Sequence, residues 1–245
     1  MKKLILTISS VLTLNISSGF AQVSYDELLE LDKALQSAFS ELSPNTGESL
    51  VVNQEVPGRP QFWWSLDTVY ASYSLGEVDG NVSHNIFLFG GFARLPGMTL
   101  DGLALTACHE IGHGIGGPPY KESGSSAEGQ SDYYSTKTCL PVVFKFLRDK
   151  EHRSLDPVAI SRCNRSSMDI DLCLRLFRAL ETDIVFFRYL GAETTFSERA
   201  KEVATELNFS ASFYPSPQCR IDTMSNGILG MKRPVCWYPN SNLSR

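Results

Sequence analysis

The chain has 245 residues, of which 42% are hydrophobic, so it can bury one sizeable core but leaves little room for two large domains. Aromatic residues make up 11% of the chain and no block of like charge occurs, which excludes a disordered or low-complexity protein. The formal net charge of −5 argues against a nucleic-acid partner.

The first residues have the pattern of an export signal. Two lysines precede an apolar stretch over residues 4–16, and Gly19-Phe20-Ala21 provides a small-residue cleavage site. We therefore expect residues 1–21 to be removed as a signal peptide, and residues 22–245 to form one exported domain, periplasmic or secreted. Cleavage would leave 20 basic and 27 acidic residues, a net charge of −7. No later run reaches the roughly 18 apolar residues of a membrane-spanning helix, so we expect no membrane insertion.

The N-terminal half begins with a helix and continues with strands. Residues 24–42 have apolar residues at helical spacing, and Ser24 and Glu27 are placed for a capping box. Residues 45–60 are rich in Gly, Pro and Asn and are predicted to be a connection. Strand patterns follow at residues 68–73 and 85–89, and the turn formers at 76–81 between them allow a hairpin with a long loop.

Helical patterns dominate the rest of the chain, and strands followed by helices predict the α+β class. The predicted helices cover residues 99–115, 125–140, 169–190 and 197–207. The proline-rich C-terminal stretch is expected to be an irregular tail that cysteines tie down.

Six cysteines remain after cleavage of the signal: Cys108, Cys139, Cys163, Cys173, Cys219 and Cys236. An even number in an exported protein favours three disulfides. Six cysteines allow 15 pairings, and only closeness along the chain favours Cys163 with Cys173 and Cys219 with Cys236. Buried free thiols remain an alternative, whereas a zinc ribbon is disfavoured because no Cys-x-x-Cys pair occurs.

The most informative segment is His109-Glu110-Ile111-Gly112-His113, an HExxH pattern. On a helix with about 100° per residue, His109 and His113 share one face and can bind the same metal ion. Glu110 lies beside that face, where its carboxylate can act on a metal-bound water as a general base. The apolar residues of the same helix fall on the opposite face, which suits a helix with one side in the core and one in a site.

A zinc site needs a third protein ligand, and the extended pattern HExxHxxGxxH fails because its last position is Pro119. Glu128 is the better candidate, and it stands with Asp132 in an ExxxD arrangement on the next predicted helix. One of these carboxylates can bind metal while the other accepts a hydrogen bond from a ligating imidazole. Glu128 can also simply cap its helix with Ser125. The remaining histidines, His84 and His152, are weaker rivals.

This combination of HExxH and a following ExxxD resembles the zinc metallopeptidases of the gluzincin type, and the rest of the chain is similar to exported bacterial proteins. The resemblance covers only the motif-bearing segment, in which 14 residues separate His113 from Glu128, fewer than in thermolysin-like members. It implies a zincin-like fold, in which a small antiparallel or mixed sheet precedes the active helix and a mainly helical, disulfide-stapled part follows.

The same resemblance implies a set of roles. His109, His113 and Glu128 would bind Zn²⁺, Glu110 would be the catalytic base, and Asp132 would orient His109. A strand before the active helix would bind the substrate backbone, for which residues 85–89 are the candidate unless they form an ordinary half-buried strand. The oxyanion would be stabilised by a side chain facing the zinc, for which the candidates are Tyr133, Tyr134, Tyr214 and Arg220.

The leading hypothesis is therefore a zinc metallopeptidase that hydrolyses peptides or proteins. One alternative is an exported, disulfide-rich binding protein with a structural or inactive zinc site. Another is a zinc hydrolase that cleaves a different amide, such as one in the cell wall. Substrate preference and oligomeric state are left open by the sequence.

Overall fold

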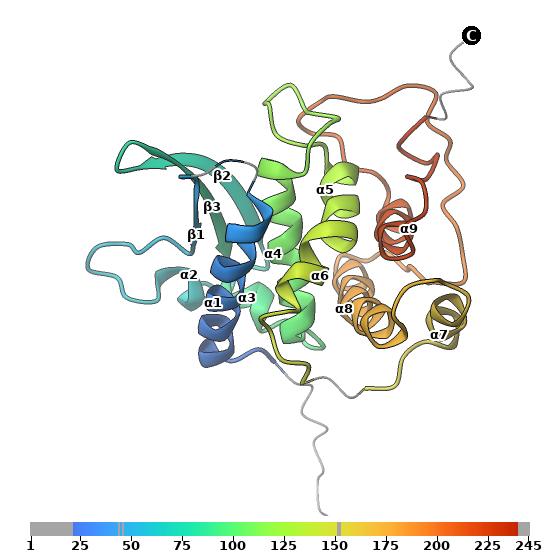
Figure 1. Ribbon diagram of the computed structural model, residues 1–245, viewed down its shortest axis with the longest axis horizontal. Helices are drawn as coiled ribbons and strands as arrows, with labels where there is room; N and C mark the ends of the chain where they lie inside the picture. The colour runs from blue at the N-terminus through green and yellow to red at the C-terminus, as the bar shows by residue number, and fades with distance from the viewer. Residues whose placement is uncertain (1–21, 44, 46, 151–152, 240–245) are drawn as a thin grey trace, which may run out of the picture.

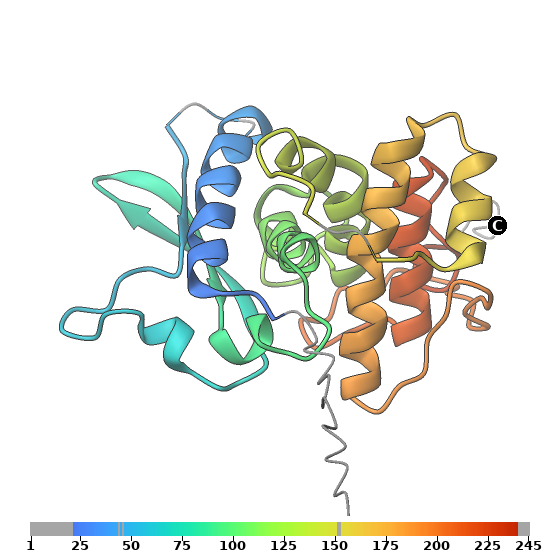
Figure 2. The ribbon, with the colours of Figure 1, turned by 90° about the horizontal axis from the view of Figure 1, so that it is seen from below.

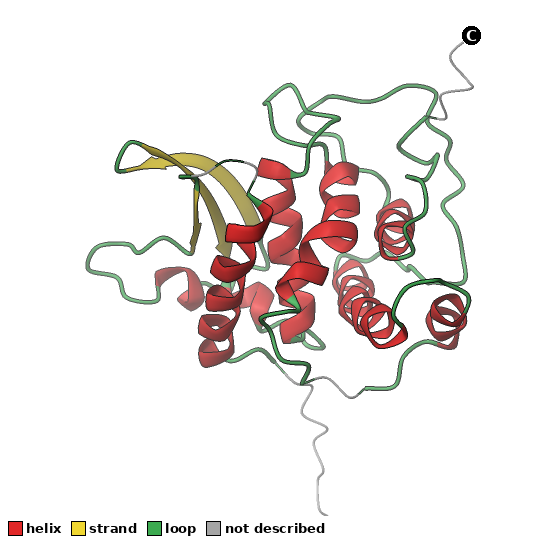
Figure 3. Ribbon diagram, in the orientation of Figure 1, coloured by secondary structure: helices red, strands yellow, loops and turns green. Residues whose placement is uncertain are grey.

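The computed structural model describes residues 22–43, 45, 47–150 and 153–239 of the chain. The predicted signal peptide, residues 1–21, and His152 lie outside the described residues. The described part is a mixed α+β structure in which the helices outweigh a small sheet (Figure 3). The α+β class is thus confirmed.

The sheet has three strands in the order β1-β3-β2, with β1 at Ser49–Val52, β2 at Ala71–Val78 and β3 at Asn81–Leu88. Strand β1 runs parallel to β3, and β2 runs antiparallel to it. The predicted hairpin is present, but its long loop is wrong, because only Asp79 and Gly80 separate the strands. Both have a positive φ, as a tight two-residue hairpin turn requires.

The helices are α1 (Tyr25–Leu42), α2 (Phe62–Ser65), α3 (Gly90–Ala93), α4 (Leu100–Ile115), α5 (Glu128–Tyr134), α6 (Leu140–Val143), α7 (Pro157–Asn164), α8 (Ile170–Tyr189) and α9 (Pro217–Ile228). A π-helical turn, η1 (Ser135–Cys139), joins α5 to α6. Ser24 and Glu27 form the predicted capping box of α1, and the hydroxyl of Thr99 caps α4.

Helix α4 is the central element of the structure. It packs against β2 and β3 on one side and against α5 and α8 on the other, while α1 contacts β1, α4 and α6. In Figures 1 and 2 the sheet and α1 form one end of the molecule, and α7, α8 and α9 form the other. Side chains on α4 can therefore face both parts.

Two sequence predictions for the C-terminal half are wrong. Residues 197–207 are not helical, because their backbone pairs elsewhere: Ala200 N–H donates to the carboxylate of Asp222, and Ala204 N–H donates to Val235 O. The stretch predicted to be an irregular tail instead contains α9, whose residues are almost all buried. Helix α9 begins after Ser216, whose hydroxyl caps it.

All six cysteines form disulfides, which pair Cys108 with Cys139, Cys163 with Cys173 and Cys219 with Cys236. The first joins α4 to η1, the second joins α7 to α8, and the third joins α9 to the segment after it. Bridges of this kind stabilise a fold by about 2–4 kcal/mol each, and they are compatible with an exported protein. Among the described residues, no helix combines the length and apolar character needed to cross a membrane.

A buried ion pair fixes α8 against the first turn of α4. Asp101 accepts two hydrogen bonds from Arg175, from Nε at 2.8 Å and from a terminal nitrogen at 2.9 Å. Asp101 is 3% exposed and Arg175 is 8% exposed. The Arg175 guanidinium also lies 3.7 Å from the ring centre of Phe144. A carboxylate buried to this degree depends on its partner for solvation.

We expect Arg175→Met to lower the free energy of unfolding by about 3–5 kcal/mol, because it leaves the Asp101 charge buried without a partner. The double variant Asp101→Asn/Arg175→Met should recover part of that loss, since it buries no unpaired charge. Denaturant-induced unfolding of both variants measures the difference. A double variant less stable than Arg175→Met would contradict this account.

Candidate metal centre

The centre is built on the face of α4 that looks away from the core. His109 and His113 lie one helical turn apart, with ring centres 4.8 Å from each other. The opposite face of α4 is held in the core by buried residues such as Leu103, Ala107 and Ile111. The spacing predicted from the HExxH pattern is therefore present in three dimensions.

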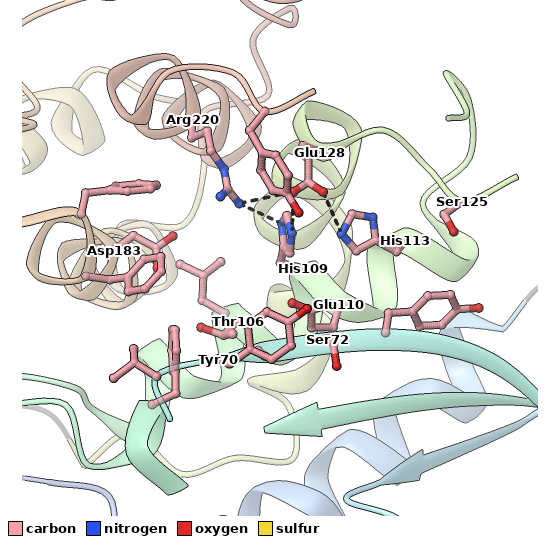
Figure 4. Close-up of a pocket in the computed structure, with 18 of the residues that line it drawn as sticks. Tyr70, Ser72, Thr106, His109, Glu110, His113, Ser125, Glu128, Asp183 and Arg220 are labelled. Atoms are coloured by element: carbon pink, nitrogen blue, oxygen red, sulfur yellow. Dashed lines mark hydrogen bonds and ion pairs between the residues drawn. The ribbon is translucent and has the colours of Figure 1, made fainter. Parts of the chain in front are cut away.

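Glu128, the first residue of α5, faces both imidazoles (Figure 4). Its Oε2 lies 3.3 Å from His109 Nε2, and its Oε1 lies 3.5 Å from His113 Nε2. One donor atom from each of the three residues can be chosen so that all lie within 4.8 Å of one another. Two imidazole nitrogens and a carboxylate oxygen gathered in this way can hold a metal ion.

The outer ring nitrogens are engaged in hydrogen bonds that leave the inner ones free. His113 Nδ1 donates to the backbone oxygen of Ser126 at 2.9 Å, and His109 Nδ1 lies 2.8 Å from Asp132 Oδ1. Because a carbonyl or carboxylate oxygen only accepts, the proton in each neutral ring belongs on Nδ1. The lone pair is then on Nε2, which faces Glu128, as a metal ligand requires. The donor set therefore fits a divalent cation.

Arg220 on α9 holds Asp132 in place. Its Nε lies 2.8 Å from Asp132 Oδ2, and its terminal nitrogen lies 2.7 Å from Oδ1, a bidentate pair. Asp132 is fully buried. The contact that would let Asp132 orient His109 is thus present and is itself braced from a third helix. Sequence analysis considered Arg220 only for the oxyanion, and nothing in its local sequence indicated this contact.

Lys121 is a second cation at the centre, and sequence analysis missed it. Its Nζ lies 2.5 Å from Glu128 Oε1, and the Lys121 side chain is 10% exposed. It comes from the connection between α4 and α5. A buried ammonium in this position balances the Glu128 carboxylate when no metal is bound.

The ionisable groups of the centre influence one another strongly. Burial lowers the pKa of His109, but the carboxylates of Asp132 and Glu128 outweigh burial and raise it to about 10. Burial and the charge on His109 lower the pKa of His113 to about 4. Glu128 keeps a pKa well below its usual range because hydrogen bonding and charge from the two histidines overcome the effect of burial. Near neutral pH the two imidazoles of the metal-free protein thus carry one positive charge between them, on His109.

Glu110 differs from Glu128 and Asp132 because its carboxylate has no partner among the described residues. It is 7% exposed, and no hydrogen bond or ion pair to its carboxylate forms within the described part of the chain. Burial raises its pKa to about 7. A carboxyl group with this pKa can both accept and release a proton near neutral pH.

Glu110 and the three metal-binding candidates line one cavity of about 320 Å³. Figure 4 shows its walls: α4 and β2 on one side, with Tyr70 and Ser72, and α8 and α9 on the other, with Asp183 and Arg220. A cavity of this size accepts a few residues of a peptide or a small molecule.

The structure shows which of the remaining candidate residues line the cavity. Tyr214 and Arg220 line the cavity, whereas Tyr133 and Tyr134 do not. Tyr133 instead donates its hydroxyl hydrogen to Met231 O. His84 lies in β3, next to the Tyr73 hydroxyl at 2.9 Å, and takes no part in the centre.

Residues 85–89 fit the alternative expectation, an ordinary strand of the sheet, better than that of a strand at the rim of the cavity. Residues 85–89 belong mostly to β3, which is paired on both sides and lies inside the sheet. The strand that lines the cavity is β2, through residues 71–73, and β2 has a neighbour on one side only in the described sheet. The order of strands in a sheet follows from pairing across the chain, so the local pattern could not assign the edge.

Comparisons of the chain with models of protein families, with curated proteins and with solved structures found no match.

We expect the purified protein to bind one divalent metal ion per chain, as measured by elemental analysis. His113→Ala and Glu128→Gln should each remove a ligand and abolish stoichiometric binding, and Asp132→Asn should weaken metal affinity by about 10–100-fold. Glu122→Gln, on the exposed part of the neighbouring connection, is the matched control and should bind like the wild type. Full metal content in Glu128→Gln would exclude this carboxylate as a ligand.

The raised pKa of Glu110 predicts a pH-dependent stability of the metal-free protein. Folding raises this pKa from 4.5 to about 7, so the carboxylate progressively costs stability as the pH rises between these values. Glu110→Gln cannot ionise, and it should be more stable than the wild type by roughly 3 kcal/mol at pH 8, with little difference near pH 4.5. Unfolding of chelator-treated protein at both pH values tests this, and an equal difference at the two values would contradict it.

Proposed function

We propose that this chain is an exported zinc-dependent metallopeptidase. The observation that carries the proposal is the grouping of His109, His113 and Glu128 around one point, with the unpartnered Glu110 facing the same cavity. Metal ligands alone would also suit a structural site. A buried carboxylate without a partner beside them is what a hydrolytic centre needs and a structural one does not.

His109, His113 and Glu128 would hold the zinc ion, and Asp132 with Arg220 would keep His109 oriented toward it. When bound, the metal supplies Lewis acidity to the scissile carbonyl and to the attacking water. Two nitrogens and one oxygen form the ligand set of many catalytic zinc sites, in which a further position stays open.

Glu110 would act as general base and then as general acid. Its carboxylate takes a proton from the water that attacks the carbonyl carbon, and it returns that proton to the leaving amine as the C–N bond breaks. Its pKa of about 7 in the metal-free protein results from burial. Because no side chain of the described residues engages it, its oxygens can reach a water molecule in the cavity.

Strand β2 would align the substrate. Its outer edge is unpaired within the described sheet, and its residues 71–73 lie along the cavity. An extended peptide can add to such an edge through backbone hydrogen bonds, which are independent of side-chain identity. Tyr214 and Arg220 are the remaining candidates for stabilising the negative oxygen of the transition state.

The arrangement of elements supports a gluzincin-like, zincin-type fold. A small mixed sheet presents an edge strand to the cavity, α4 carries both histidines and the base, and α5 supplies the third ligand with its ExxxD partner. Three disulfides fit the export that residues 1–21 predict.

The second candidate is an exported binding protein with a structural or inactive site. The observation that favours it is the ion pair of Lys121 with Glu128, which already neutralises the third ligand without any metal. Stoichiometric zinc in a protein that cleaves no peptide of a broad library would support this alternative.

The test of the peptidase is Glu110→Gln. We expect wild-type protein loaded with zinc to cleave peptides of a mixed library, with cleavage sites identified by mass spectrometry, and chelation to stop it. Glu110→Gln should reduce the rate by about 10²–10⁴-fold while zinc content and the circular dichroism spectrum stay unchanged. Glu206→Gln, on an exposed segment away from the cavity, is the control. Undiminished cleavage by the Glu110 variant would disprove the assigned role.

A further inference from the structure

The end of the cavity formed by α8 contains a carboxylate that the proposed chemistry does not use. Asp183, Phe186 and Phe187 stand at positions i, i+3 and i+4 of α8, so they share one face, and all three line the cavity. Figure 4 shows the Asp183 carboxylate directed into the cavity, on the side opposite to His113.

Apolar and aromatic side chains line the cavity together with Asp183. Phe92 and Leu105 line the same cavity, and the rings of Phe92 and Phe186 lie 5.1 Å apart, centre to centre. Helix α8 packs closely against α4 because α4 has a glycine, Gly102, at the point of contact. A Cβ at Gly102 would lie 2.2 Å from the hydroxyl of Thr182, so only glycine permits this approach beside Asp183.

Asp183 has no partner among the described residues: no hydrogen bond or ion pair to its carboxylate forms there. The nearest candidate cation, Arg220, uses its Nε and a terminal nitrogen on Asp132. Burial raises the pKa of Asp183 to about 7, with the charge of Arg220 opposing the rise. A buried carboxylate with no cation in direct contact is costly, and a ligand that brings such a cation lowers that cost.

We propose that this part of the cavity, with Asp183 at its end and Phe186 and Phe187 beside it, selects peptides by a cationic group. The ligand would be the ammonium or guanidinium of a lysine or arginine side chain, or the free α-amine of the peptide. This inference rests on the proposed function, because it takes the cavity to be the place where a peptide lies.

The chemistry of the recess favours a cation over the other side-chain classes. An ammonium can donate to the carboxylate while its methylene groups or the charge itself contact aromatic rings. An acidic side chain would meet Asp183 as a like charge, and an apolar side chain would leave the carboxylate buried and unpaired. The lysine and the arginine that line the cavity, Lys121 and Arg220, are already paired with Glu128 and Asp132.

Binding can be measured separately from cleavage in zinc-loaded Glu110→Gln protein. The probes are capped alanine hexapeptides with a single lysine, arginine or norleucine placed at each position in turn, together with norleucine peptides that keep a free α-amine. We expect lysine or arginine at one position, or the free amine, to bind about 10–100-fold more tightly than the capped norleucine peptide, the factor that a charge-assisted hydrogen bond supplies. Acetylation of that amine should remove the gain.

Asp183→Asn on the same background should abolish the preference, and Asp183→Glu should restore part of it. Asp171→Asn makes the same substitution at an exposed position of α8 outside the cavity, and it should leave the preference intact. The proposal is overturned if cationic and norleucine peptides bind alike, or if the preference survives in Asp183→Asn. If the Asp183 variants do not fold, the comparison of acetylated with unmodified peptides still shows whether binding depends on the cationic group.

The two proposals fail in different ways. If wild-type protein selects cationic peptides through Asp183 but cleaves none of them, peptide hydrolysis is refuted and the recognition stands. If it cleaves peptides without regard to basic residues or a free amine, hydrolysis stands and the role of Asp183 is refuted.

Discussion

The approach of α5 to α4 decides where Glu128 lies relative to the two histidines. A Cβ at Gly112 would lie 3.0 Å from the Ser131 Cα, so the helices meet almost backbone to backbone at this point. Backbone hydrogen bonds pin the start of α5, since Ser126 N–H donates to His113 O and Ala127 N–H donates to Pro119 O. A larger residue at 112 would push Glu128 away from the imidazoles.

The carboxyl groups around the cavity outnumber its lysine and arginine side chains. Two cationic side chains, Lys121 and Arg220, face four carboxyl groups: Glu110, Glu128, Asp132 and Asp183. If all four are ionised and both histidines are neutral, as metal binding requires, the group carries an excess of two negative charges, the amount that a divalent metal would balance. In the metal-free protein the two carboxyl groups without a partner, Glu110 and Asp183, are those whose pKa burial raises to about 7.

The sequence predicted the parts of the centre that depend on helical spacing. His109, Glu110 and His113 lie within one turn of α4, and Glu128 and Asp132 lie one turn apart on α5, so periodicity alone places each pair on a common face. The capping box of α1 was likewise predicted from local spacing, because Ser24 and Glu27 are three residues apart at the start of a helical pattern. Local signals sufficed wherever the interacting residues are neighbours in the chain.

The features that sequence analysis missed depend on contacts between distant segments. Strand β1 is four residues long and exists through its pairing with β3. Asp183 lies on a helix whose existence was predicted, but its position in the cavity depends on how α8 crosses α4. Lys121 reaches Glu128 from a connection without regular structure. None of these contacts between distant segments produces a periodic pattern in the sequence.

The brace of Arg220 on Asp132 spans 88 positions along the chain. The three candidate ligands and Asp132 all lie on α4 and α5, whereas the residue that braces Asp132 lies on α9. Vectorial synthesis therefore delivers Arg220 long after Asp132, the carboxylate that it holds. A fragment that ends before α9 would keep the complete HExxH and ExxxD patterns and lack the brace on the carboxylate that contacts His109.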